Sequence, residues 1–158
     1  QRRGVLSDEI VPVFKPPVVL VPVARLDRAT LQAVAFARSI SPTVRAVHIA
    51  TTPESAEQFR ERWLRWTRDV PLDVIESPYR SLLQPLLRYI ERVDEKDDRP
   101  ITIVLAEFVP RNWWEWILHS QTALRLKLAL LFRPNTIVID VPYHFADTGH
   151  TTKDQGKK

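Results

Sequence analysis

The sequence predicts an α/β fold in which five parallel strands form one doubly wound sheet with the strand order 3-2-1-4-5. Two observations predict it. Short apolar runs rich in β-branched residues alternate with longer segments of helical period, and strands joined by crossover helices pair in parallel. The chain has 158 residues, 44% of them hydrophobic, which is enough for one buried core. We therefore expect one domain over residues 18–145, between a linker at 1–17 and a disordered tail at 146–158.

The first half of the chain predicts three strands and the helices that follow them. The strands are expected at residues 18–23, 44–50 and 72–75. Pro22 has no backbone N–H, so it should lie near the end of its strand or at a position that makes no hydrogen bond. Asp27 can cap the first helix, and Thr52 followed by a proline is typical of the start of the second. These signals place a helix after each of the first two strands.

Two of the helices are predicted to bury one face. In the second helix Phe59, Trp63 and Trp66 recur at helical spacing and form an apolar stripe. The third helix is expected to begin at a capping box made by Ser81 and Gln84. Its core-facing residues are expected to be Leu82, Leu86, Ile90 and Val93.

The second half of the domain predicts a βαβ unit, in which a helix joins two parallel strands. The strands are expected at residues 101–106 and 136–141. Between them, a connection at 107–116 leads into a helix that Asn112 can cap and that ends before Pro134. This connection contains no glycine, so it does not predict the usual phosphate-binding turn between a strand and a helix.

The composition excludes several classes of function. Without cysteine, the chain has no disulfide, no thiolate nucleophile and no cysteine-bound metal. Its four histidines lack the spacing of metal ligands, so no metal is predicted. The net charge of +4 comes from basic residues interleaved with acidic ones, which argues against DNA binding but is compatible with small anions or an acidic membrane surface. No apolar run is long enough to span a membrane.

No catalytic arrangement is evident, and we predict that the chain is not an enzyme. His119 and Ser120 look like a hydrolase pair, but adjacent residues on a helix point about 100° apart and cannot act together as base and nucleophile. No carboxylate dyad or phosphate loop accompanies them.

A ligand is expected at the carboxyl ends of the strands, where the strand order changes between the first and fourth strands. Arg25 and Asp27 follow the first strand. Thr51 follows the second strand, and Arg111 lies in the connection after the fourth. Helix N-termini and arginines at this edge favour a negatively charged group. Plainer interpretations stay open: Asp27 as a helix cap, the arginines as surface residues, and His48 as a side chain that points into a satisfied interior or an interface.

Two further features point to contacts between molecules. Trp113, Trp114 and Trp116 cannot all face one helix stripe, so they either meet a partner, ligand or membrane, or pave a corner of the core. The last strand would form an unpaired apolar edge, and such an edge invites pairing with a second copy. The residues expected in a homodimer interface are Ile137, Ile139, Val141, Tyr143 and Phe145.

Three segments, at residues 107–122, 136–145 and 21–30, resemble the C-terminal cytosolic domain of bacterial amino acid–polyamine–cation superfamily permeases, and the KUP-type potassium–proton symporters among them. The resemblance implies a universal-stress-protein-like fold at the cytoplasmic face of the membrane, joined to the transmembrane part of the same polypeptide and dimerising beneath it. A chain that lacks methionine and starts at Gln1 is expected to be a piece of a longer protein. In potassium importers of this group the resemblance also implies binding of cyclic di-AMP.

The resemblance sets the ligand expectation. ATP-binding universal stress proteins carry a Gly-x-x-Gly loop after the fourth strand, which residues 107–116 replace here, so ATP is not expected. We predict a regulatory domain that senses cyclic di-AMP and needs no cofactor; the alternatives are a purely structural dimerisation module and a small enzyme acting on nucleotides or phosphoesters. The predicted nucleotide-binding residues are Arg25, Asp27, Thr51, Arg111, His119 and Ser120.

Overall fold

The computed structural model describes residues 15–77, 83–109, 125, 129–130 and 132–144. Along the chain the elements are β1 (Val18–Pro22), α1 (Arg28–Ile40), β2 (Val44–Ala50), α2 (Pro53–Trp66), β3 (Leu72–Glu76), α3 (Leu83–Lys96), β4 (Ile101–Val109) and β5 (Thr136–His144). Among the described residues, no helix is both long enough and apolar enough to cross a membrane.

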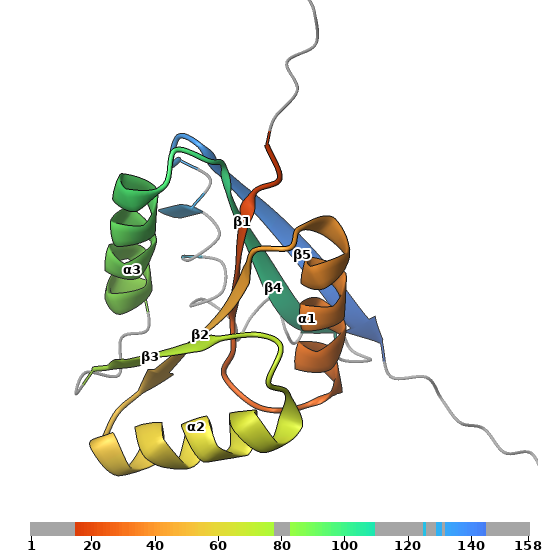
Figure 1. Ribbon diagram of the computed structural model, residues 1–158, viewed down its shortest axis with the longest axis vertical. Helices are drawn as coiled ribbons and strands as arrows, with labels where there is room; N and C mark the ends of the chain where they lie inside the picture. The colour runs from red at the N-terminus through yellow and green to blue at the C-terminus, as the bar shows by residue number, and fades with distance from the viewer. Residues whose placement is uncertain (1–14, 78–82, 110–124, 126–128, 131, 145–158) are drawn as a thin grey trace, which may run out of the picture.

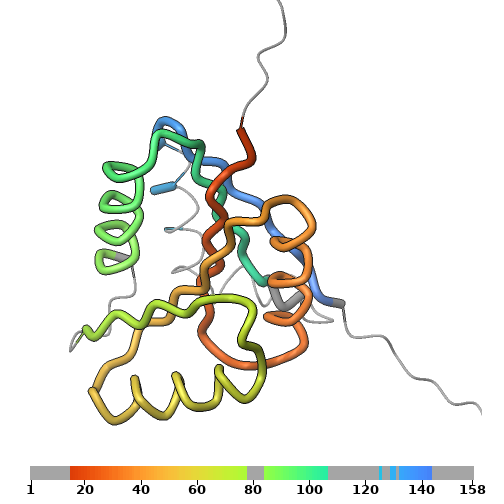
Figure 2. The backbone as a smooth tube through the Cα atoms, in the orientation of Figure 1, coloured from red at the N-terminus to blue at the C-terminus, as the bar shows by residue number. Residues whose placement is uncertain are grey.

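One sheet of five strands organises the domain. Its order is β3-β2-β1-β4-β5, and every neighbouring pair is parallel, so the predicted fold class and strand order are confirmed. Figure 1 shows α1 and α3 on opposite sides of this sheet. The described chain enters at the amino end of β1 and leaves at the carboxyl end of β5, at opposite ends of the sheet (Figure 2).

The two faces of the sheet carry separate apolar clusters. On one face, Val19, Val21 and Val104 pack with side chains of α1 and α2. On the other, Leu20, Ile101 and Ile103 pack with Leu86 and Ile90 of α3 and with Leu130. Strands buried on both faces are expected to be apolar at consecutive positions rather than at alternate ones, and the Val18–Val21 run has that composition.

The first two helices begin at capping residues that the sequence predicted. The Thr30 backbone N–H donates to Asp27 Oδ1 at 2.9 Å, which makes Asp27 the N-cap of α1. Thr52 caps α2, and Ser55 completes a capping box with it. Pro22 is the last residue of β1, which is one of the two positions that its missing N–H allows. These expectations are confirmed.

The aromatic stripe of α2 is also confirmed. Phe59 and Trp63 are buried, and Trp66 packs partly buried against the same cluster. The Trp63 indole N–H donates to the Val70 carbonyl at 2.9 Å, so the buried ring has its polar atom satisfied. In α3, Leu86 and Ile90 are buried and Val93 is partly buried, as predicted.

Two predicted strand ends are wrong. The fourth strand was expected to end at residue 106 and the fifth at residue 141, but β4 continues through Val109 and β5 through His144. Glu107 pairs with Pro142, and Val109 pairs with His144. Each strand therefore provides the pairing partner for the last residues of the other. Pro142 is tolerated because β5 lies at the edge of the sheet.

Other expectations fall outside the described residues. These are the cap residue Ser81, the core residue Leu82, the start of the helix expected after Asn112, the three clustered tryptophans Trp113, Trp114 and Trp116, residues 1–14 of the predicted linker, and the tail at 146–158.

Candidate functional site

A cavity of about 320 Å³ lies at the carboxyl ends of β1 and β2, which is the predicted end of the sheet. The ligand was expected between the first and fourth strands, whereas the described lining of this cavity comes from β1, β2 and α3. We call it the crest cavity. Its walls are largely apolar and include Pro22, Ala24, Ile49 and Leu86, with His48 as the one aromatic ring that lines it among the described residues. Apolar walls with few polar groups suit a planar organic group such as a nucleobase.

His48 lines this cavity and also contacts the core. Its ring stacks on Phe59, with centroids 3.6 Å apart and planes inclined by 5°. Its Nδ1 lies 2.7 Å from the Val23 carbonyl; because a carbonyl only accepts, Nδ1 carries a proton and the neutral ring keeps Nε2 as an acceptor. Burial lowers the pKa of His48, and the bond to Val23 opposes this only in part. His48 is thus half-buried and hydrogen-bonded, as expected for a satisfied side chain. It also lines the crest cavity, which the sequence did not lead us to expect.

Arg25 and Asp27 lie together just beyond β1. Arg25 Nη2 is 3.8 Å from Asp27 Oδ2, and the Arg25 side chain is 78% exposed. The Arg25 carbonyl accepts from the Thr30 hydroxyl at 2.7 Å. The loop is therefore tied to the first turn of α1, while the guanidinium stays open to solvent. Asp27 serves as the helix cap, which was one of the two interpretations left open.

The remaining predicted ligand residues divide into two groups. Thr51 is exposed and directly follows β2, which pairs with β1, so it lies at the same end of the sheet as Arg25. Arg111, His119 and Ser120 lie outside the described residues, and their roles stay predictions.

The expected dimer edge is only partly open to solvent. Ile137 is 53% exposed, whereas Ile139 and Val141 are partly buried and pack on the α1 side of the core. Tyr143 is half-buried, and Phe145 lies outside the described residues. Of the five predicted interface residues, Ile137 thus offers the clearest exposed apolar surface in the described part of the chain.

Sequence reasoning missed a polar network at the opposite end of the sheet. Arg45, near the amino end of β2, binds Asp73 of β3 through two hydrogen bonds of 2.9 and 3.0 Å. The Tyr89 hydroxyl of α3 donates to the same carboxylate. Burial would raise the pKa of Asp73, but the bonds from Arg45 and Tyr89 outweigh it and hold this pKa below its usual value. The sequence did contain a signal for this network, because a charged residue lies within each of two apolar strands, Arg45 in β2 and Asp73 in β3.

These contacts also act on the two partners. The hydrogen bond to Asp73 raises the pKa of Arg45. Burial, and then the hydrogen bond to Asp73, raise the pKa of Tyr89 to about 12. Tyr89 therefore remains a neutral donor at physiological pH, and Asp73 remains an ionised acceptor. In the part of the chain that the structure describes, no group of three or more histidine and carboxylate side chains is placed to hold a metal ion.

Comparisons with known proteins found a matching family and a similar curated protein. The family described as KimA potassium transporter C-terminal domain matches residues 15–143. The potassium transporter KimA of Bacillus subtilis (strain 168) is 32% identical to this chain over 135 residues, which are 84% of the chain and 22% of that transporter. The chain thus spans about a fifth of the length of this relative.

Proposed function

We propose that this chain is a regulatory domain of a potassium transporter, in which it senses a nucleotide and forms a dimer. The chain belongs to the KimA potassium transporter C-terminal domain family. The relative in Bacillus subtilis is named a potassium transporter, and the matched part is 22% of it. In this proposal the rest of the polypeptide lies in the membrane and carries potassium, and the domain lies at its cytoplasmic face.

The ligand that we propose is cyclic di-AMP. The observation that carries this proposal is the crest cavity, whose apolar walls suit an adenine and which lies at the same end of the sheet as Arg25 and Thr51. The exposed Arg25 guanidinium can form charge-assisted hydrogen bonds with a phosphate. The neutral His48 ring adds a hydrogen-bond acceptor, Nε2, which suits the amino group of adenine.

The same region is poorly suited to a triphosphate. A phosphate loop needs glycines so that the backbone can approach the phosphates, and the three glycines of the chain, Gly4, Gly149 and Gly156, all lie outside residues 18–145. A cyclic dinucleotide presents two separated phosphodiesters and two bases, so side chains rather than a loop can recognise it.

Dimerisation would give this ligand a matching symmetry. Cyclic di-AMP has two equivalent halves, and a two-fold dimer presents the same residues twice. The edge strand β5, with the exposed Ile137, is the surface we propose for this contact. The alternative is a structural module that dimerises through β5 without binding a nucleotide.

Calorimetric titration with cyclic di-AMP tests the ligand claim, and sedimentation velocity tests the dimer. We expect heat with one ligand per two chains and a loss of affinity in Arg25→Gln. Arg68→Gln is the matched control, because Arg68 is exposed and lies in the turn after α2, away from the crest cavity. Dimers without any heat would favour the structural module. The absence of both heat and dimers would refute the proposal.

A further inference from the structure

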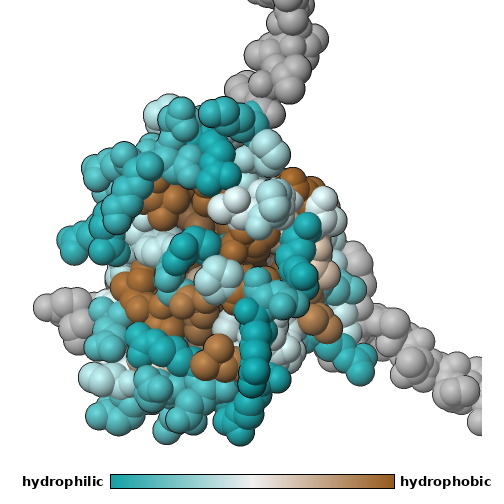
Figure 3. Space-filling model, in the orientation of Figure 1, coloured by the Kyte–Doolittle hydropathy of each residue, from teal (hydrophilic) through white to brown (hydrophobic). Residues whose placement is uncertain are grey.

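A second cavity, of about 670 Å³, lies between α3 and the strands β2 and β3, toward the amino ends of the strands. We call it the basic groove. Figure 3 views the molecule from the side of this groove: hydrophobic residues are visible between α3 and the lower elements β3 and α2, with hydrophilic residues around them. The cationic side chains that line it are Arg45, Arg60, Arg92, Lys96 and Arg99.

The two carboxylates of the groove are already neutralised by arginines. Asp73 receives two hydrogen bonds from Arg45 and one from Tyr89. Asp97 receives the Arg99 side chain at 2.6 and 2.9 Å and the Arg99 backbone N–H at 3.0 Å. These bonds with Arg99 lower the pKa of Asp97 to about 2. Neither carboxylate is therefore free to neutralise a further cation.

Arg92 and Lys96 are groove cations whose positive charge is not neutralised by another side chain in the described part of the chain. Among the described residues, neither side chain forms an ion pair or a hydrogen bond. They are four residues apart on α3 and both line the groove, so they lie next to each other on one helix face. Like charges at this spacing repel each other. A bound anion would remove this repulsion.

We propose that the basic groove binds a phosphate group through Arg92 and Lys96. Arginine and lysine are the side chains that recognise phosphate oxygens, by forked hydrogen bonds and as a compact charge respectively. The volume of the groove is within the range of sites that hold small organic ligands. The apolar side chains of Val18, Val74 and Val93 line the same groove and suit the carbon skeleton attached to the phosphate.

This site is distinct from the crest cavity. The groove is lined by Val18, Thr43 and Leu72, which lie at the amino ends of three strands or just before them. The crest cavity lies at the carboxyl ends. The phosphate can belong to an anionic lipid headgroup, since the family is named for a transporter, or to a soluble phosphate compound.

Two binding experiments, called arms below, distinguish a lipid headgroup from a soluble phosphate compound. One arm measures co-sedimentation with vesicles of phosphatidylglycerol and phosphatidylcholine, against phosphatidylcholine alone; the other titrates inorganic pyrophosphate by calorimetry. Binding in the vesicle arm alone identifies a headgroup site, and binding in the pyrophosphate arm alone identifies a site for a soluble phosphate.

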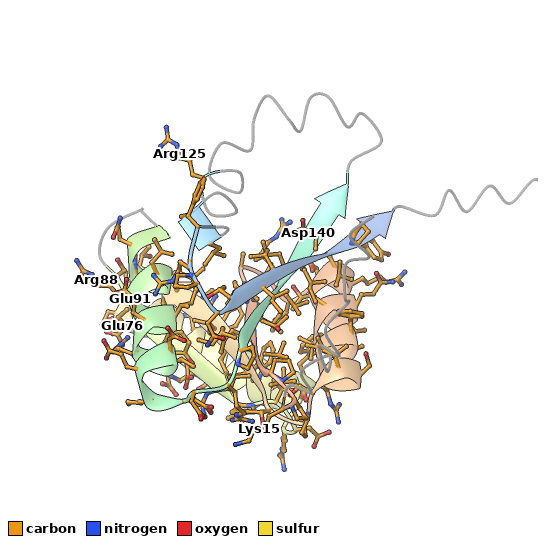
Figure 4. All side chains as sticks on the ribbon, turned by 90° about the horizontal axis from the view of Figure 1, so that it is seen from above. Lys15, Glu76, Arg88, Glu91, Arg125 and Asp140 are labelled. Atoms are coloured by element: carbon orange, nitrogen blue, oxygen red, sulfur yellow. The ribbon has the colours of Figure 1, made fainter. Side chains whose placement is uncertain are left out.

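The discriminating variant is Arg92→Gln with Lys96→Gln. The matched control is Arg88→Gln with Arg62→Gln, which removes the same charge from two exposed side chains that do not line the groove. Figure 4 shows Arg88 on the outer side of α3, pointing away from the sheet. Each lost charge-assisted hydrogen bond is expected to weaken binding roughly tenfold or more.

The groove variant should therefore lose binding while the control keeps it. Its melting temperature should not fall, because the two side chains have no partner in the described part of the chain. No binding in either arm, or equal losses in the groove variant and the control, would overturn the proposal.

Discussion

Replacement of Trp63 by phenylalanine tests how much the buried indole ring and its hydrogen bond stabilise the core. Trp63 is 1% exposed and lies between Phe59 and Trp66, with ring centroids 6.5 and 5.2 Å away. Its indole N–H donates to the Val70 carbonyl. Phenylalanine keeps an aromatic ring in the cluster but removes this donor and part of the apolar volume.

The expected loss of stability has two parts. A buried carbonyl left without its donor costs about 1–3 kcal/mol. The smaller ring leaves a void, and each missing methylene-sized group costs about 0.8 kcal/mol or more. The sum predicts that Trp63→Phe lowers the free energy of unfolding by roughly 2–4 kcal/mol, and that Trp63→Ala lowers it by about 3–5 kcal/mol.

Urea unfolding followed by far-ultraviolet circular dichroism measures these changes, since tryptophan fluorescence would itself change with the substitution. The matched control is Leu64→Ala, at the next position of the same helix, where the side chain is 58% exposed. Its effect should stay within about 0.5 kcal/mol. A cost below about 1 kcal/mol for Trp63→Phe, or an equal cost for Leu64→Ala, would refute the reasoning.

Three further predictions concern the caps and the polar network. Asp27→Ala should cost about 1 kcal/mol in a urea titration, because the Thr30 N–H loses its acceptor; no measurable change would contradict the cap. Asp73 has a folded pKa below its usual value, since the bonds from Arg45 and Tyr89 outweigh burial. Its stabilisation is therefore present above pH of about 4 and lost as the pH falls through the folded value. Asp73→Asn should flatten this acid limb, and unfolding midpoints that fall with acid as steeply as in the wild type would exclude the network as its source. Tyr89 has its pKa raised to about 12 by burial and by Asp73, so its contribution is present below pH of about 10 and lost as the pH rises toward the folded value. Tyr89→Phe should be less stable at neutral pH and should lose less stability at alkaline pH, as measured by thermal unfolding at each pH.

The helix starts were predictable because their causes are local. Asp27 and Thr52 reach backbone N–H groups only three residues ahead, so the relevant partners are visible in the sequence. The stripe of Phe59, Trp63 and Trp66 is equally local, since helical periodicity places these residues on one face.

The ends of β4 and β5 were not predictable in the same way. A strand continues as long as its neighbour offers a partner, and the pairing of Glu107 with Pro142 joins residues far apart in the chain. The expected connection therefore starts later than the apolar pattern indicated, and the last three residues of β4 belong to the sheet.

The sequence by itself determined the type and order of the described elements, the parallel sheet, and the end of the sheet at which Arg25, Asp27 and Thr51 lie, because caps, periodicity and crossover connections act over a few residues. Only the tertiary structure decided which charges meet. Arg45 and Asp73 are 28 residues apart, and Tyr89 is 16 residues beyond Asp73. These side chains come within hydrogen-bond distance only once β2 and β3 have paired and α3 has packed on the sheet, and the same packing leaves Arg92 and Lys96 beside the groove.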